Sequence, residues 1–418
     1  MDQSNRANEL RKAGKYEEAI KIYKELWELD ENKFTAAGLL HCYRKQKKFE
    51  EAFELIKETK ERFQDFNWYK NEYSWTLISG CLNQLPDDPN THDVVDIATK
   101  ILDINPDELA YNKAVFKVAK AAKKNEDWEI LSEWLNKIDP EKLKIKEKGK
   151  DWSESEIWHY YKAVYLLKTE KFEDAISFIN QIKDQFKDKA KFFDRLIAKA
   201  CIETDDLEVS EEIYERLTKN RKADWWLLHE YAKVMLESGK QREALKLMFN
   251  AANSPGPLKN KVSLINDLAN LLVQQNKSGE ALLHFQLVRS LRDEEGWSIS
   301  PELSENIKRT REANPELEIP RKTKDLIKHC KEIWRQALGI KESNQKRLKT
   351  KNIKGKVNLG DPSKPFCFIQ TGNRESFFCS KSDLPEGTQN HQMVTFDLKP
   401  SFDKKKNKKS FSACNVKC

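Results

Sequence analysis

The 418-residue sequence contains few residues that interrupt helices, with 13 glycines and 13 prolines. Such a small supply of turn formers suits long helices with short connections and argues against a many-stranded sheet protein. The sequence also lacks apolar stretches long enough to span a bilayer, and its N-terminus has no apolar signal core. We therefore expect a mostly helical protein that makes no contact with a membrane.

Cysteines are widely spread and never form a C-x-x-C pair, which argues against a disulfide framework. We expect reduced thiols in a cytoplasmic protein. If Cys367 and Cys379 face one another across paired strands, they could form a four-thiolate zinc site with Cys414 and Cys418. Because the short spacings that anchor such sites are missing, no metal ligand is predicted. The other four cysteines are Cys42, Cys81, Cys201 and Cys330.

Signatures of catalysis are absent as well. The sequence has no G-x-x-x-x-G-K-[ST], G-x-G-x-x-G, H-E-x-x-H or G-x-S-x-G motif. The seven histidines are scattered rather than clustered. We therefore expect no enzyme, no catalytic residue and no cofactor.

Charge is distributed unevenly along the chain. The net charge of +7 conceals 23 Lys+Arg against 9 Asp+Glu in residues 321–418, and 52 against 59 in residues 1–320. An acidic body joined to a basic tail predicts two separate functions on one chain. The net charge of +14 in the tail indicates a polyanionic partner.

A repeated pattern runs through the acidic body. A small residue is followed four positions later by a large apolar one, so that both share a helix face. Ala19 and Ala52 are 33 residues apart, and Ala175, Ser210 and Ala244 follow one another at 35 and 34. The segments with this pattern are GKYEEAIKIY (14–23), KFEEAFELI (48–56), KFEDAISFI (171–179), GKQREALKLM (239–248) and GEALLHF (279–285).

These segments resemble the start of the second helix in the tetratricopeptide repeat. The resemblance implies an α-solenoid over residues 1–320, with about eight helical hairpins up to residue 290 and one or two trailing helices. A solenoid of this kind has a concave groove lined by its first helices, which holds an extended peptide or a helix of a protein partner.

Residues 321–353 are expected to form a basic capping helix and a linker. Apolar residues recur at helical spacing from Arg321 to Leu338, and lysines and arginines occupy the other faces. Two interpretations of this basic face remain open: a solvated surface on a terminal cap, or a contact with nucleic acid.

The last segment, residues 354–418, shows alternating patterns typical of short strands. Five strands in about sixty-five residues suit a small closed barrel. The predicted strands lie at 356–359, 365–369, 376–379, 390–399 and 410–416.

Residues 352–417 resemble the cold-shock domain, a five-stranded OB-fold. The segments SKPFCFI (363–369) and ESFFC (375–379) are similar to its two nucleic-acid-binding motifs, and ACNV (413–416) is similar to its closing strand. The family stacks bases of single strands on exposed aromatic rings beside basic side chains. Carried over, Phe366, Phe368 and Phe377 are the stacking rings and Lys356 and Lys364 contact the backbone.

Strand alternation from Phe377 predicts that Phe378 points into the barrel core. The lysines of the run before the last strand are expected to hold phosphates. They are Lys404, Lys405, Lys406, Lys408 and Lys409.

The sequence thus predicts a non-enzymatic adaptor that binds a protein partner through the array and single-stranded RNA or DNA through the barrel. Joining these two modules suggests a subunit of an RNA-handling or antiviral complex, of undetermined oligomeric state. The alternative is a pure protein-interaction subunit whose barrel is a docking module. The chain departs from the family's motifs at Pro365, Cys367 and Cys379, which favours this alternative, whereas the charge of the tail favours nucleic acid.

Overall fold

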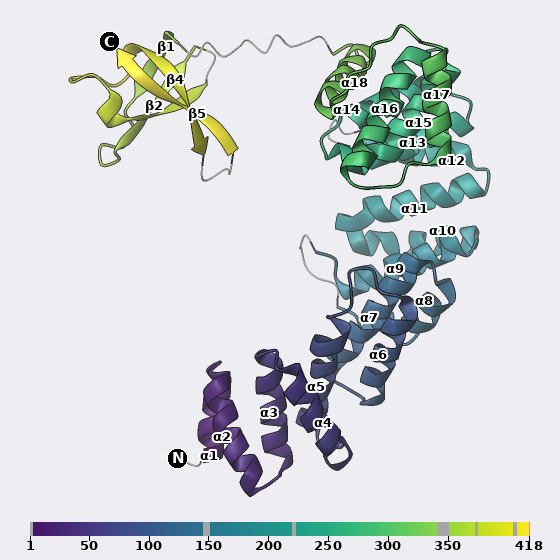
Figure 1. The fold of residues 1–418 in the computed structure, drawn as a ribbon, viewed down its shortest axis with the longest axis vertical. Coiled ribbons are helices and arrows are strands. Elements are labelled where there is room, and N and C mark those ends of the chain that lie inside the picture. The colour runs from purple at the N-terminus through teal and green to yellow at the C-terminus, as the bar shows by residue number, and fades with distance from the viewer. Residues whose placement is uncertain are drawn as a thin grey trace. The chain divides into compact units, whose positions relative to one another are not determined.

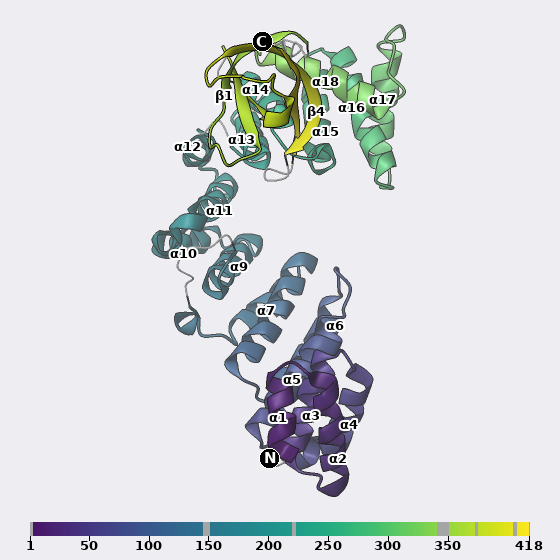
Figure 2. The same cartoon turned by 90° about the vertical axis from the view of Figure 1, so that its left-hand side faces the viewer.

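The computed structural model describes residues 3–144, 151–219, 223–340, 351–372, 375–403 and 408–417. The chain divides into two compact units, Met1–Ser254 and Pro255–Cys418. The first unit is entirely helical in its described part, whereas the second contains four α-helices followed by a β-barrel (Figures 1 and 2). Tetratricopeptide-like helices followed by a closed five-stranded barrel confirm the predicted fold class.

The described residues of the first unit form seven consecutive antiparallel helical hairpins. Six of them have a short connection, and the third has a π-helical turn at Ile78–Leu82 before its second helix. The hairpins are α1 (Gln3–Lys12) with α2 (Tyr16–Leu29), α3 (Lys33–Lys45) with α4 (Phe49–Phe63), α5 (Asn67–Leu77) with α6 (Thr91–Asp103), α7 (Glu108–Asn125) with α8 (Trp128–Leu135), α9 (Glu154–Lys168) with α10 (Phe172–Ile182), α11 (Ala190–Glu203) with α12 (Leu207–Thr218), and α13 (Trp225–Glu237) with α14 (Gln241–Asn253).

The second unit begins with one further hairpin, α15 (Val262–Gln274) with α16 (Ser278–Glu294). The helices α17 (Pro301–Glu312) and α18 (Thr323–Ala337) both pack against α16. Trp334 of α18 is fully buried, and its indole Nε1 donates a hydrogen bond of 2.8 Å to Nε2 of His284 on α16. The basic segment predicted as a capping helix therefore has one face fixed by a buried tryptophan.

The repeat pattern read from the sequence is the pattern of helix packing. Each small residue is completely buried, because two helices approach closely only where one of them offers a small side chain. The large residue four positions later is also buried and fills the space beside it. The small residues are Ala19, Ala52, Ala175, Ser210, Ala244 and Ala281, and the large ones are Tyr23, Ile56, Ile179, Tyr214, Met248 and Phe285.

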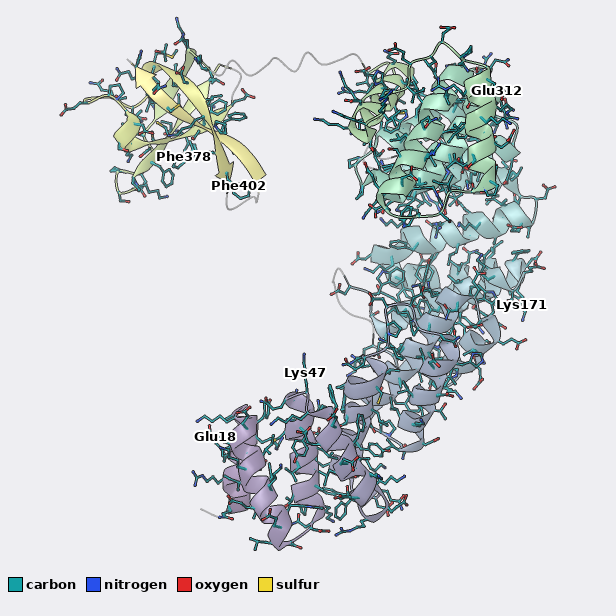
Figure 3. The ribbon with its side chains drawn as sticks, in the orientation of Figure 1. Glu18, Lys47, Lys171, Glu312, Phe378 and Phe402 are labelled. Carbon is teal, nitrogen blue, oxygen red and sulfur yellow. The ribbon has the colours of Figure 1, made fainter. Side chains whose placement is uncertain are left out.

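The hairpin turns share one backbone geometry. In seven of the eight hairpins described, a single residue with positive φ follows the first helix, and the next backbone N–H bonds to a carbonyl five residues earlier. This bond closes the helix end in the manner of a Schellman motif. The residues with positive φ are Gly14, Lys47, Glu126, Glu170, Asp205, Gly239 and Asn276, and Figure 3 labels Lys47.

This geometry predicts opposite effects for two substitutions. Gly239 has φ +73°, and no atom lies within 4 Å of the position that a Cβ would occupy, so that Gly239→Ala adds backbone strain without a clash. We expect Gly239→Ala to lower the free energy of unfolding by about 1 kcal/mol. Glu170→Gly should raise it by about 0.5–1 kcal/mol, because Glu170 has φ +59°. Urea unfolding followed by circular dichroism measures both, and a neutral Gly239→Ala would contradict the explanation.

The barrel is a single closed sheet with the strand order β1-β2-β3-β5-β4. The β3 and β5 strands pair in parallel, and all other neighbours are antiparallel. Its core contains Val357, Ile369, Phe396 and Leu398, among others. The strands are β1 (Ile353–Asn358), β2 (Phe366–Thr371), β3 (Ser376–Ser380), β4 (Met393–Asp403) and β5 (Lys408–Lys417).

Candidate functional site

The outer face of β2 and β3 carries aromatic side chains on the barrel surface. In β2, Cys367 and Ile369 point into the core, so Phe366 and Phe368 point outward. The antiparallel register pairs Phe368 with Phe378 of β3. Because directly paired residues lie on the same face of a sheet, Phe378 also points outward.

The predicted orientations of the two phenylalanines in β3 were therefore wrong. Phe378 is 46% exposed, whereas Phe377 packs against the barrel core with its ring centroid 5.9 Å from that of Phe396. The sequence places two phenylalanines side by side in a five-residue strand, and alternation alone does not say which of them faces inward. The register with β2 decides it, because Phe377 pairs with the inward-facing Ile369.

Three phenylalanine rings form one continuous surface on this face. The centroid of Phe378 lies 5.4 Å from that of Phe366 and 6.3 Å from that of Phe368, and the latter two are 5.9 Å apart. Phe368 is 42% exposed. Figure 3 labels Phe378 on the barrel. We call Phe366, Phe368 and Phe378 the aromatic platform.

Polar and basic side chains border the aromatic platform. Lys356 and Asn358 are exposed on β1, where Asn358 pairs directly with Phe368. Lys364 is exposed in the turn between β1 and β2, with its Nζ 4.0 Å from a carboxylate oxygen of Asp361. Lys381 donates hydrogen bonds to the backbone carbonyls of Asp361, at 2.8 Å, and Pro362, at 3.3 Å, which fixes this turn beside β2.

The predicted lysine run lies only partly within the described residues. Lys404, Lys405 and Lys406 lie outside them. Lys408 and Lys409 belong to β5, where their backbones pair with Asp403 and Phe402 of β4. The β4 and β5 strands thus extend further toward this run than the sequence predicted.

Further apolar side chains on the barrel surface escaped the sequence analysis. Met393 is 52% exposed, Phe402 is 55% exposed and Phe411 is 37% exposed. All three are apolar residues near the ends of strands, which the sequence alone could have indicated. The fourth strand was predicted to end at residue 399, so Phe402 was left outside any strand. These residues enlarge the apolar surface that a partner could cover.

Two cysteines face each other across paired strands inside the barrel, which the sequence analysis had considered possible. Cys367 and Cys379 are register partners and are both buried. Burial, together with the neighbouring Cys367, raises the pKa of Cys379 to about 12, so this thiol stays protonated at neutral pH. Over the described residues, no group of three or more His, Cys, Asp or Glu side chains is arranged to hold a metal ion.

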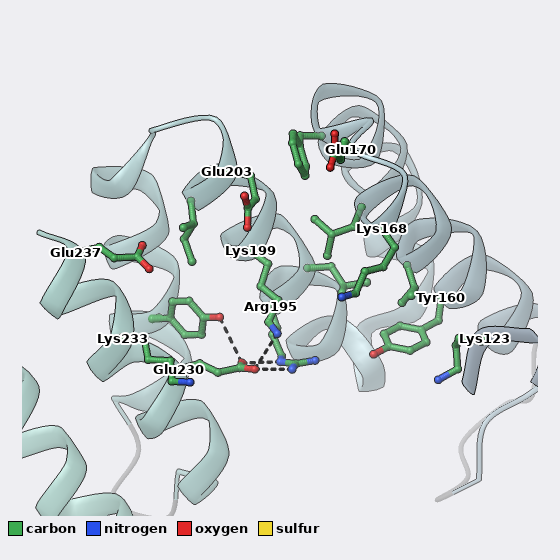
Figure 4. Close-up of a pocket in the computed structure, with 16 residues that line it drawn as sticks. Lys123, Tyr160, Lys168, Glu170, Arg195, Lys199, Glu203, Glu230, Lys233 and Glu237 are labelled. Carbon is green, nitrogen blue, oxygen red and sulfur yellow. Dashed lines mark hydrogen bonds and ion pairs between the residues drawn. The ribbon is translucent and has the colours of Figure 1, made fainter. Parts of the chain in front are cut away.

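A second candidate site is a groove of about 640 Å³ in the first unit, shown in Figure 4. Most of its lining comes from the first helices of successive hairpins, α7, α9, α11 and α13. The lining residues include Lys123, Tyr160, Lys168, Glu170, Arg195, Lys199, Glu203, Glu230, Lys233 and Glu237. The predicted groove of first helices is therefore present in this part of the array.

Glu230 of α13 organises the centre of the groove. Its carboxylate accepts hydrogen bonds from Arg195 at 2.5 and 2.6 Å and from the hydroxyl of Tyr214 at 3.3 Å, and Nζ of Lys199 lies 2.9 Å away. Burial alone would raise the pKa of Glu230, but Arg195 and Lys199 outweigh it and hold the pKa below its ordinary value. The groove thus keeps a fixed network of charges at neutral pH.

Two known families match segments of the helical part. A family described as tetratricopeptide repeat matches residues 10–70. The match covers the first two helical hairpins, and the array as a whole consists of tetratricopeptide-like hairpins. A second family, described as a domain of unknown function (DUF7017), matches residues 191–330. No curated protein matches the sequence.

Several solved structures are similar to the repeat array at low identity. A tetratricopeptide repeat protein from Parabacteroides merdae is 14% identical, with 74% of this chain and 97% of that chain covered and a TM-score of 0.28. The TPR2AB domain of yeast Sti1, in a complex with pHSP90, is 14% identical over 74% and 96%, with a TM-score of 0.26. Naa15/Naa10 bound to HypK-THB is 15% identical over 80% and 48%, with a TM-score of 0.29.

No helix in the described part of the chain is long and apolar enough to cross a membrane.

Proposed function

We propose that this protein is a non-enzymatic adaptor that binds a protein partner through its tetratricopeptide array and single-stranded RNA or DNA through its barrel. The observation that carries the nucleic-acid part is the aromatic platform on β2 and β3. Three rings there are held together in contact, and two of them are more than 40% exposed. Exposed rings in a basic segment suit base stacking, which tolerates any sequence because every base has a flat face.

The barrel topology supports the same assignment. OB-folds are five-stranded barrels that bind oligonucleotides on the face of strands 2 and 3 and on the loops between strands 1 and 2 and strands 4 and 5. In this barrel β2 and β3 carry the aromatic platform, and Lys364 lies between β1 and β2. Of the lysine run, residues 404–406 fall between β4 and β5 in the sequence, and Lys408 and Lys409 begin β5. We assign the barrel to the OB-fold class and, more narrowly, to a cold-shock-like domain.

The residues then take distinct roles. Phe366, Phe368 and Phe378 stack on bases, and Lys356 and Lys364 contact phosphates beside them. The lysines Lys404, Lys405, Lys406, Lys408 and Lys409 supply further positive charge for the backbone. We infer no stacking role for Phe377, because its ring packs against the core.

The array supplies the protein-binding part of the proposal. Its groove runs over the first helices of four hairpins, and it presents charged side chains held by the network around Glu230. Concave grooves of helical repeats bind extended peptides or single helices. We place the adaptor in the cytoplasm, as a subunit of a complex that handles RNA or acts against foreign nucleic acid.

A second candidate function is a protein-docking barrel without nucleic acid. Met393, Phe402 and Phe411 favour it, because they add exposed apolar surface beyond the aromatic platform. The two functions differ in their dependence on salt. Phosphate contacts weaken steeply as salt rises, whereas apolar docking does not.

Fluorescence anisotropy with the full-length chain tests the proposal. Labelled 24-nucleotide RNA and DNA single strands and a DNA duplex are titrated at 50 and 200 mM salt. We expect micromolar or tighter binding of at least one single strand, stronger than that of the duplex and weakened by salt. Absence of binding at 50 mM salt would reject the nucleic-acid function and leave the docking module.

A further inference from the structure

Helix α18 has two faces of opposite character. Leu326, Cys330 and Trp334 are buried and fix the helix on α16. The exposed side carries Lys324, Lys328, Lys331 and Arg335 at intervals of four, three and four residues. Such spacing places all four cations along one stripe, and at 1.5 Å per residue the stripe is roughly 16 Å long. We call these four residues the cationic stripe.

The repulsion within the cationic stripe is unfavourable to the helix itself. Like charges three or four residues apart repel each other on a helix surface. Arg321 and Lys322 precede the helix and Lys324 lies in its first turn, where the helix dipole favours negative charge such as that of Asp325, whereas Arg335 lies in the last turn, where positive charge is favourable. Among the described residues, the one ion pair found on the stripe joins Lys328 to Glu332 at 4.0 Å. A helix that only caps the array would not need four cations along one exposed face.

A buried neighbour adds to the positive charge at the stripe. Lys261, directly before α15, is fully buried. Burial together with the charge of Lys331 lowers the pKa of Lys261 to about 8. An anion bound beside Lys331 would offset the repulsion between these two ammonium groups.

We propose that the cationic stripe of α18 is a second binding surface, which holds the phosphate backbone of the same single strand whose bases stack on the barrel. This inference rests on the proposed function. Fifteen residues separate Ala337 from Ile353, so the covalent chain limits the distance between the end of α18 and the start of β1 to at most ~58 Å. A strand that reaches both sites is bound more tightly than by either site alone.

The test replaces the stripe without changing helix propensity. The full-length quadruple variant Lys324→Gln/Lys328→Gln/Lys331→Gln/Arg335→Gln is titrated with a 6-nucleotide and a 24-nucleotide single strand over a range of salt. Loss of four phosphate contacts should reduce the slope of log K against log salt by about 3 for the 24-mer. Its affinity at 50 mM salt should fall on the order of 100-fold. The 6-mer, short enough for one OB-fold, should bind as it does to the wild-type chain.

A matched control separates contact from overall charge. The variant Lys21→Gln/Lys24→Gln/Lys57→Gln/Lys60→Gln removes the same charge from exposed positions on α2 and α4. It should bind the 24-mer like the wild-type chain. Equal losses in both variants would overturn the inference, because the effect would then be long-range attraction rather than contact.

Two further outcomes distinguish failure of the inference from failure of the proposed function. A stripe variant that keeps wild-type affinity and salt slope for the 24-mer overturns the inference and leaves the proposed function intact. Failure of the wild-type chain to bind either strand rejects the proposed function and the inference with it. As a second measurement on the unmodified chain, acetylation of Lys324, Lys328 and Lys331 should be slowed by the 24-mer and not by the 6-mer. Unchanged acetylation would count against the inference even if the variant misfolded.

Discussion

Replacing Phe368 and Phe378 with alanine should abolish most single-strand binding while leaving the barrel folded. Both side chains lie on the outer face, so that truncation removes little of the core. Stacking contributes about 1–3 kcal/mol per base, which corresponds to roughly 5- to 150-fold in affinity for each ring. We expect each single variant to lose about 10-fold or more and the double variant about 100-fold or more, measured by anisotropy.

Two controls make this prediction specific. Phe34→Ala removes a phenylalanine that is 55% exposed on α3, and it should leave the affinity unchanged. Phe377→Ala should lower the stability of the barrel, because Phe377 packs on the core, but it should not remove a stacking ring. Loss of binding in a folded Phe377→Ala variant, with none in Phe378→Ala, would restore the orientation predicted from the sequence.

Replacing Trp334 should be the most destabilising single change in α18. Its side chain is 0% exposed against α16, and Trp334→Ala is expected to cost about 3–5 kcal/mol. Trp334→Phe keeps most of the packing but leaves Nε2 of His284 without its donor, at a cost of about 1–3 kcal/mol. Hydrogen exchange of α18 amides measures both effects. Trp297→Ala, at a residue 42% exposed, is the control and should change stability by less than about 0.5 kcal/mol.

The same contact makes the docking of α18 sensitive to acid. Burial lowers the pKa of His284 from 6.5 to about 4, and the neutral ring accepts the hydrogen bond from Trp334. Because the pKa is lower in the folded protein, His284 binds a proton on unfolding between pH 6.5 and 4. The free energy of unfolding is therefore highest above pH 6.5 and decreases as the pH drops toward 4. The total loss is about 3 kcal/mol. Exchange in α18 that is equally slow at pH 4 and pH 7, after correction for intrinsic rates, would contradict this.

The sequence predicted the helical array well because its signal is local and repeated. Ala19 and Ala52, and Ala175, Ser210 and Ala244, mark positions where helix packing permits only a small side chain, and within each group the spacing is 33 to 35 residues. The turn geometry was not predicted, because lysine, glutamate, aspartate and asparagine occupy most of the positive-φ positions where glycine would have been the signal.

The barrel was predictable in strand number and less so in detail. Its strands were identified by alternation, but β4 extends to Asp403 and β5 starts at Lys408, beyond the predicted ends. The faces of Phe377 and Phe378 depend on pairing with β2, which is a contact between separate parts of the chain. A local sequence pattern does not determine this register, which explains why Phe377 was wrongly predicted to be a stacking residue.

The shared hairpin turn also has an evolutionary consequence. The bond from the N–H of Asp206 to the carbonyl of Cys201 recurs 34 residues later between Lys240 and Met235. Each hairpin thus closes this connection with its own backbone, whereas its neighbours contact it through apolar packing and through bonds such as that of Arg195 to Glu230. Duplication or deletion of one whole period joins equivalent positions and preserves every turn. The length of the array, and with it the reach of its groove, can therefore change in single genetic steps while the basic C-terminal segment stays the same.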